Sequence, residues 1–262
     1  AVLAGLLSGH HALIRSVPVA AAVQALAISP DGTTLLVGEG EGGTARYNTA
    51  ILGRPSHSPL PGWTIEYRND GEQLLFAGRG RSGFNSDGNT FSAAVADGLS
   101  APLEHLRLTG LDGDAMTAGD AAYGGDGRLM AAYGDTVDGG ITNGQPIMVD
   151  SAVAVWDTTA PDRPIMTVRP MPSFAVALSP DGQTLYVGTQ EPALEAISVP
   201  DGRIINSIPL PAATPLLPKP AGLDTIWDAL SDTIEVSPDG KTLAVGEGNL
   251  VALYDAATLT PL

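Results

Sequence analysis

One stretch of thirteen residues occurs three times in the chain, as "ISPDGTTLLVGEG" (28–40), "LSPDGQTLYVGTQ" (178–190) and "VSPDGKTLAVGEG" (236–248). In each copy, Ser-Pro-Asp-Gly separates two apolar runs that are rich in strand-forming residues. Proline presets φ for the first position of a tight turn, and glycine adopts the left-handed conformation that other residues resist. Each copy therefore predicts a β-hairpin.

Two weaker copies share the same order of features, "IEYRNDGEQLLFAG" at 65–78 and "AAYGGDGRLMAAYG" at 121–134. The five copies have an aspartate in the turn, and these turn aspartates are separated by 39, 56, 55 and 58 residues. The first spacing lies close to the period of about 40 to 45 residues that four-stranded propeller blades show, and the longer ones leave room for inserted loops. The five turn aspartates are Asp31, Asp70, Asp126, Asp181 and Asp239.

Further apolar segments follow the hairpins. Third strands are expected at 44–48, 152–157, 193–199 and 250–255, and fourth strands at 103–108, 164–168 and 203–208. The sequence therefore predicts an all-β fold, a β-propeller of four-stranded antiparallel blades. About five blades are visible, which form either a closed five-bladed ring or part of a larger propeller. Residues 13–262 are assigned to the propeller, with 13–17 as a candidate for the missing outer strand, and residues 1–12 to a helical lead-in or linker.

The hairpins, together with "AVAVWDTTAPDRP" at 152–164 and its Trp156-Asp157 pair, resemble the WD40-type repeats of multidomain bacterial signalling proteins. The segment "EAISVPDGRIINSIPLP" at 195–211 resembles YVTN-type repeats, and the lead-in resembles the one before the propellers of STAND-class NTPases. The only Gly-His pair, at Gly9-His10, lies outside the blades, so the WD40 hydrogen-bond network is not expected. The resemblance implies a cytoplasmic binding module, or a periplasmic or secreted one if the YVTN likeness holds.

Composition excludes several classes of function. The formal net charge of −16 at pH 7 disfavours binding to nucleic acid or to an anionic membrane surface. The absence of cysteine excludes disulfides, thiolate metal sites and thiol nucleophiles. The longest apolar stretch, "AVLAGLLSG" at 1–9, is far shorter than the roughly 20 residues that span a bilayer, so no membrane insertion is expected.

The inventory of catalytic groups is small. The chain has four histidines, and none forms a metal-ligand pattern with another histidine or a carboxylate. No nucleophile elbow, zinc-protease motif, phosphate-binding loop or dinucleotide fingerprint occurs. We therefore expect no enzyme activity and no cofactor.

Two acidic loops contain part of a calcium-binding pattern. Both lack its later positions, so turn formation by Asp and Asn is the default interpretation and calcium the alternative. The calcium candidates are Asn85, Asp87 and Asn89 in "NSDGNT", and Asp112, Asp114 and Asp120 in "LDGDAMTAGD".

Three insertions distinguish this propeller, at 79–91, 134–150 and 211–232, and loops on a rigid scaffold are where binding residues concentrate. In the third insertion, "LDTIWDAL" predicts a short helix with an apolar anchor at Trp227, or a tryptophan packed against its own blade. The candidate partner-binding residues are Trp227, Leu223, Ile226, Leu230, Arg79 and Arg81.

The leading hypothesis is a non-catalytic interaction or sensor module that binds a protein partner or another domain of its own polypeptide. The alternative is a propeller hydrolase of the lactonase or glycosidase type, in which carboxylates from at least three blades would converge in the central channel. A secreted carbohydrate-binding propeller is a third hypothesis.

Overall fold

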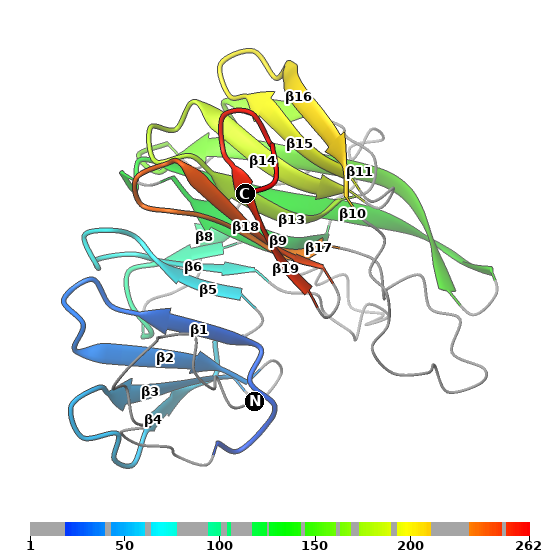
Figure 1. Cartoon of the computed structure of the whole chain (residues 1–262). Coiled ribbons are helices and arrows are strands. Elements are labelled where there is room, and N and C mark those ends of the chain that lie inside the picture. Colours follow the sequence, from blue (N-terminus) through cyan, green and yellow to red (C-terminus); the bar gives the residue numbers. More distant parts are fainter. Residues whose placement is uncertain are drawn as a thin grey trace.

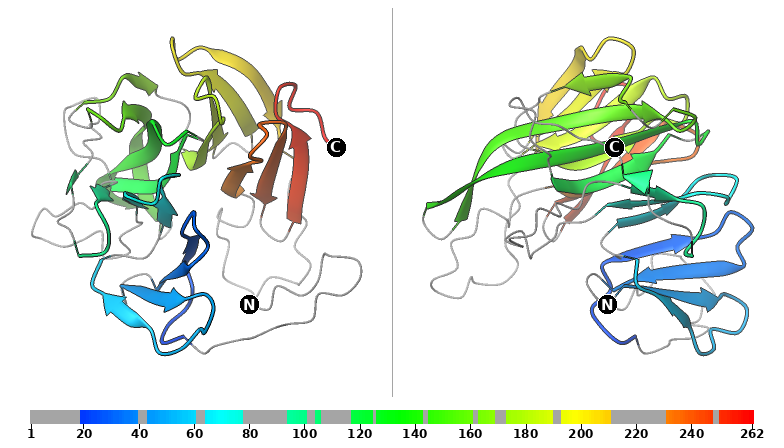
Figure 2. Two further views of the ribbon diagram at one scale, coloured as in Figure 1. Left: turned by 90° about the vertical axis from the view of Figure 1, so that its left-hand side faces the viewer. Right: turned by 180° about the vertical axis from the view of Figure 1, so that it is seen from behind.

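The computed structural model describes residues 19–39, 43–60, 64–77, 94–100, 104–105, 117–124, 126–142, 145–160, 163–168, 173–189, 193–210, 231–247 and 250–262. All elements in these ranges are strands, and they form five small antiparallel sheets. The sheets stand in a ring as the blades of a five-bladed β-propeller, as Figures 1 and 2 show. The predicted fold class is confirmed.

The blades are numbered in chain order, and each begins with an inner strand. Blade 1 contains β1 (Ala25–Ile28), β2 (Thr34–Gly38), β3 (Thr44–Asn48) and β4 (Ser56–Ser58). Blade 2 contains β5 (Thr64–Tyr67), β6 (Leu74–Ala77), β7 (Ala94–Ala96) and β8 (Glu104–His105). Blade 3 contains β9 (Thr117–Tyr123), β10 (Leu129–Thr142), β11 (Gln145–Asp157) and β12 (Met166–Val168). Blade 4 contains β13 (Ser173–Leu178), β14 (Thr184–Thr189), β15 (Ala193–Ser198) and β16 (Ile204–Pro209). The described part of blade 5 contains β17 (Ser231–Val236), β18 (Thr242–Glu247) and β19 (Leu250–Asp255).

The predicted hairpin turns are present in all five blades. The turn glycines Gly32, Gly71, Gly127, Gly182 and Gly240 have φ between 68° and 75°. In the turn of blade 4, Ser179 Oγ donates to Asp181 Oδ1 at 2.6 Å, and Ser179 Oγ accepts from Thr184 N at 2.9 Å. Asp181 Oδ1 also accepts from Gln183 N at 3.0 Å. The Ser-Pro-Asp-Gly sequence therefore builds the turn through its side chains as well as its backbone preferences.

Consecutive blades pack face to face through two sets of side chains. The forward face of a blade meets the next blade in the chain. On this face the inner strand places the residues four and six positions before the turn aspartate, which in blade 4 are Ala177 and Ala175. The backward face meets the preceding blade, and its inner strand contributes the residues three and five places before the turn aspartate. Four apolar clusters combine residues of blades 1 and 2, 2 and 3, 3 and 4, and 4 and 5. Burial of these clusters is the main stabilisation of the ring.

The turns also contact one another around the ring. A Cβ placed on Gly71 would lie 3.3 Å from the Pro30 side chain of blade 1, and one on Gly240 would lie 3.3 Å from the Pro180 side chain of blade 4. Gly127 and Gly182 approach side chains of the preceding blade still more closely. The turns of blades 2 to 5 therefore pack against the blade before them.

The prediction of an inserted loop at 134–150 is wrong. Most of these residues belong to the long strands β10 and β11, which pair with each other out to Thr142 and Gln145. Figure 1 shows this hairpin projecting beyond its own blade. The sequence reading also missed β4 and β7. The candidate outer strand at 13–17 and the lead-in at 1–12 lie outside the described residues.

Candidate functional site: the central cavity

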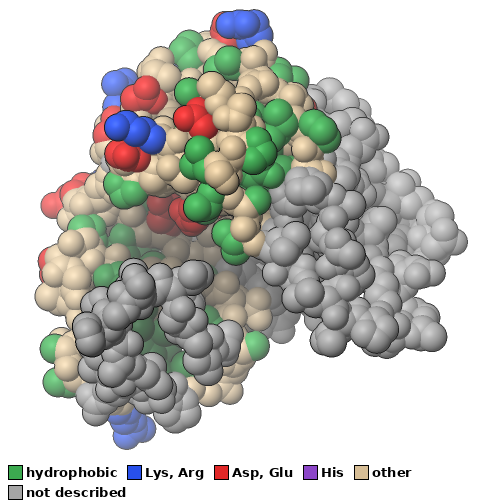
Figure 3. Space-filling model, in the orientation of Figure 1, with side chains coloured by type: hydrophobic (Ala, Val, Ile, Leu, Met, Phe, Trp, Pro, Cys, Tyr) green, Lys and Arg blue, Asp and Glu red, His purple; other side chains and the backbone are tan. Residues whose placement is uncertain are grey.

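The inner strands of all five blades surround one cavity of about 970 Å³. Its lining includes residues of β1, β5, β9, β13 and β17. Figure 3 shows acidic side chains in the hollow between blade 1 and the blades above it. The cavity is acidic because three carboxylates from three blades line it, Glu66, Asp120 and Glu235.

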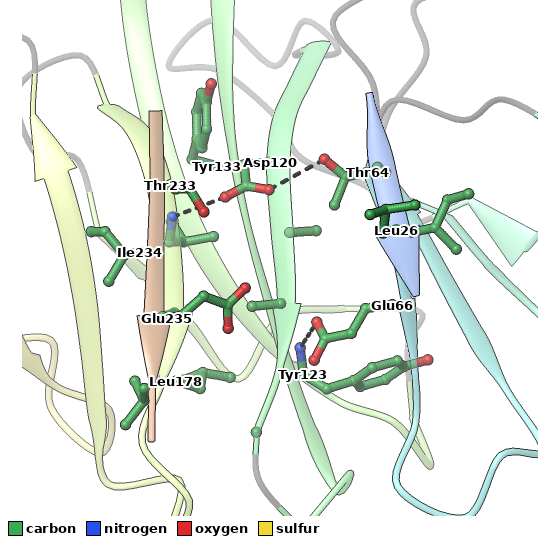
Figure 4. Close-up of a pocket in the computed structure, with 18 of the residues that line it drawn as sticks. Leu26, Thr64, Glu66, Asp120, Tyr123, Tyr133, Leu178, Thr233, Ile234 and Glu235 are labelled. Carbon is green, nitrogen blue, oxygen red and sulfur yellow. Dashed lines mark hydrogen bonds between the residues drawn. The ribbon is translucent and has the colours of Figure 1, made fainter. Parts of the chain in front are cut away.

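Glu66 joins blade 2 to blade 3. Its Oε2 accepts a hydrogen bond from the backbone N–H of Tyr123 at 2.8 Å, as Figure 4 shows. Burial raises the pKa of Glu66 to about 8, and the charges of Glu235 and Asp120 act in the same direction, while the hydrogen bond from Tyr123 opposes them. The Glu66 carboxyl therefore holds a proton near neutral pH more strongly than an ordinary glutamate.

Asp120 contacts the blades on both sides of its own. It accepts from Thr64 Oγ1 of blade 2 and from Val176 N of blade 4, both at 3.3 Å. Burial raises the pKa of Asp120 to about 6, although the hydrogen bonds from Val176, Ala121 and Thr64 stabilise the anion. Asp120 thereby satisfies a backbone N–H at the channel edge of β13 that has no strand partner on that side.

Glu235 is the exception among the three carboxylates. Glu235 as a whole residue is exposed, and it lines the cavity. The walls of the cavity still remove water from its carboxyl group, and this desolvation raises the pKa of Glu235. Glu66 and Glu235 occupy the same repeat position, four residues before the turn aspartates Asp70 and Asp239. No side-chain hydrogen bond joins the Glu235 carboxylate to another described residue, whereas the Glu66 carboxyl group accepts one from the blade that follows it.

The sequence analysis missed Glu66 and Glu235 as cavity residues. A signal was present, because the other three blades have alanine at this position, namely Ala27, Ala122 and Ala177. A carboxylate at an apolar position of an inner strand indicates a group that faces the channel. Asp120 was named only as a calcium candidate, and its described contacts are the two neighbouring blades.

The structure describes few of the predicted site residues. The partner-binding candidates Trp227, Leu223, Ile226, Leu230, Arg79 and Arg81 lie outside the described ranges, as do Asn85, Asp87, Asn89, Asp112 and Asp114. Within the described ranges, no group of three or more His, Asp or Glu side chains is placed to hold a metal ion. The same ranges contain no helix long and apolar enough to span a membrane.

The WD40-like tryptophan is buried without a polar partner. Trp156 is fully buried in the cluster between blades 2 and 3, and its Nε1 has no hydrogen-bond acceptor among the described residues. The neighbouring Asp157 caps its turn, since its Oδ1 accepts from Thr159 N at 2.9 Å. The tryptophan therefore contributes apolar packing, while the aspartate shapes the turn after β11.

No protein-family model matches the sequence, and no curated protein matches it. In contrast, 1407 chains of solved structures match its fold. One is the β-propeller domain of Cps50 (Swd1) from Myceliophteria thermophila, with a TM-score of 0.59 and 11% sequence identity over 92% of this chain and 72% of that chain. The chain thus has a β-propeller fold, shared with a protein of very different sequence.

Proposed function

We propose that the chain is a non-catalytic interaction scaffold that binds a protein partner or another domain of the same polypeptide. The observation that carries the proposal is the two-stranded arm formed by residues 136–142 of β10 and 145–150 of β11. Among the described residues, β9 pairs with β10 only as far as Asp135, and β12 pairs with β11 only at 153–155. Both edges of the arm therefore offer backbone groups to another chain.

Three carboxylates from three blades line the cavity, as the hydrolase alternative requires, but two of them have a structural role. Glu66 and Asp120 each accept a hydrogen bond from the backbone of the next blade, so both help to hold neighbouring blades together. The likeness to the Swd1 propeller domain supports a binding role in general, because propellers of this kind present rigid surfaces to partners. The hydrolase alternative is not favoured.

The arm can be removed without cutting the blade. Asp135 and Ser151 are cross-strand partners, so replacing 136–150 by Asn-Gly joins them through a two-residue hairpin turn. We expect wild-type protein, immobilised and cross-linked in an extract of the source cells, to retain at least one protein that the arm-deleted variant does not retain. An unchanged thermal unfolding curve of the variant would show that its blades remain folded.

Two results would contradict the proposal. One is an identical set of retained proteins for wild type and the arm-deleted variant. The other is turnover of an ester, lactone or glycoside that disappears in Asp120→Asn and Glu66→Gln but persists in Glu72→Gln, where the carboxylate is exposed.

A further inference from the structure

The five blades have only four packed interfaces among the described residues. The residue five places before the turn aspartate lies on the backward face, and in blades 2 to 5 it is buried: Ile65 5%, Ala121 4%, Val176 1% and Ile234 3% exposed. The equivalent residue of blade 1, Leu26, is 58% exposed, and Ile28 on the same face is 62% exposed. The inner strand of blade 1 therefore lacks the cover that every other inner strand has.

The opposite side of this opening is also apolar and exposed. On the forward face of blade 5, Val251 is 76% exposed and Leu253 is 48% exposed. In blades 1 to 4, the forward face is covered by the next blade. Figure 3 shows apolar side chains on the surface over blade 5 beside the acidic hollow.

Two independent features indicate the same missing neighbour. A Cβ on Gly32 of blade 1 would meet nothing within 4 Å, whereas the other four turn glycines contact the preceding blade. The Glu235 carboxylate of blade 5 has no hydrogen-bond partner among the described residues, whereas the carboxyl group of its counterpart Glu66 accepts from a backbone N–H of the next blade. Among the described residues, a turn contact, the cover of an apolar face and a hydrogen-bond donor are all lacking at one place in the ring.

We propose that the space between blade 5 and blade 1 receives a β-hairpin from a separate partner polypeptide. The four packed interfaces define its chemistry: alternating aliphatic side chains toward Val251 and Leu253, and a backbone N–H directed at Glu235. On blade 1 the hairpin covers the inner strand, because Val37, Ala45 and Tyr47 farther out on the same face are already buried. A second copy of the chain fits poorly, because each copy has a net charge of −16.

The inference rests on the proposed function, and a probe from the chain itself can test it. The peptide of residues 173–189 forms the inner hairpin of blade 4, and its backward face, with Val176 and Leu178, packs on blade 3 in the intact protein. We expect the fluorescein-labelled peptide to bind the full chain in a saturable manner, measured by fluorescence anisotropy. Leu26→Lys and Leu253→Lys should each weaken binding by about tenfold or more, because each places a charge in an apolar contact.

Controls separate the opening from other sites. Ile205 is 50% exposed on the outer strand β16, so Ile205→Lys should leave the peptide affinity unchanged. A peptide carrying Val176→Lys and Leu178→Lys should not bind. No binding of the natural peptide, or binding unaffected by Leu26→Lys and Leu253→Lys, would overturn the inference. Sedimentation that shows dimers in wild type but monomers in Leu26→Lys would overturn it in favour of a second copy.

A cysteine pair tests whether blades 5 and 1 cover each other. The chain has no cysteine, so Ile28→Cys with Leu253→Cys introduces the only thiols. We expect the pair to stay reduced under mild oxidation, since a disulfide requires Cα atoms within about 7 Å. Rapid, complete disulfide formation would show direct closure and overturn the inference. The arm-deleted variant should bind the peptide as wild type does. If wild type retains proteins through the arm but does not bind the peptide, the proposed hairpin site is wrong and the proposed scaffold function stands.

Discussion

Glu66 and Asp120 show how a single carboxylate can join blades of a propeller. The inner strands have one edge without a strand partner, and their N–H groups there need an acceptor. Each carboxylate reaches forward to the next blade, Glu66 to Tyr123 N and Asp120 to Val176 N. Burial makes the charged form costly, so the proton held by Glu66 near neutral pH links stability to pH.

The raised pKa of Glu66 predicts a stability that falls as pH rises. The folded protein keeps the Glu66 proton up to about pH 8, whereas the unfolded chain releases it near 4.5, so stability is lost across that window. In Glu66→Gln the amide oxygen still accepts from Tyr123 without a charge. We expect the variant to be more stable than wild type at pH 9, by about 1 to 3 kcal/mol, and nearly equal at pH 4.

Urea unfolding at several pH values measures this difference. Glu72→Gln is the matched control, because the Glu72 side chain lies on the same blade and is 80% exposed. Parallel pH profiles for wild type and Glu66→Gln would show that Glu66 is not the group responsible.

At the scale of the elements, the repeated turn has two tasks. It reverses the chain between the first two strands, and it rests on the blade before it. A comparison of Gly182 with Gly32 distinguishes the two roles. Both have left-handed φ, of 68° and 71°, but a Cβ on Gly182 would lie 2.8 Å from Leu129 Cδ1 of blade 3, whereas one on Gly32 would meet nothing within 4 Å.

Alanine at these two glycines should therefore have unequal effects. Gly32→Ala should cost about 1 kcal/mol of unfolding free energy, from the left-handed backbone alone. Gly182→Ala should cost about 1 to 2 kcal/mol more, because Leu129 must move. Thermal unfolding of the two variants under one condition measures the difference. Equal losses would mean that Leu129 moves aside freely and that the contact between this turn and blade 3 contributes nothing.

The turns and most strands could be predicted because their signals are local. Pro180, Asp181 and Gly182 specify a hairpin within a few residues, and the alternating runs around them specify strands. The arm formed by β10 and β11 was missed because Gly139 and Gly140 resemble loop residues. In the structure they lie at a shift in register between Asp138 and Ile141, within a local hairpin. Asn143-Gly144, between the paired Thr142 and Gln145, was the available signal for a hairpin.

At the scale of the whole molecule, the four apolar interfaces among the described residues each join blades that are neighbours in the chain. A linear array of this kind has stability that depends on interfaces between neighbours. Blades 3 and 4 each have two packed interfaces, whereas blades 1 and 5 have one each among the described residues. The alanines at the same position of other blades could have indicated that Glu66 and Glu235 face the channel. The hydrogen bonds of Glu66 and Asp120 could not be predicted, because they are made only after the blades assemble.

Local unfolding should therefore follow a gradient along the array. We expect backbone amides of β2 and β18 to exchange with deuterium faster than those of β10 and β14, because blades 1 and 5 can detach by breaking one interface. Native-state hydrogen exchange with mass spectrometry measures the opening free energy of each strand. Equal opening free energies for all four strands would indicate a single cooperative unit instead.

The forward contacts of Glu66 and Asp120 have a consequence for how such a chain can change over generations. Both carboxylates contact backbone N–H groups of the next blade rather than a particular side chain there. Any blade with the same strand geometry offers that group, whatever its sequence. A gene segment that encodes one blade can therefore be duplicated in tandem, and the copy inherits a working junction before a single substitution has been selected.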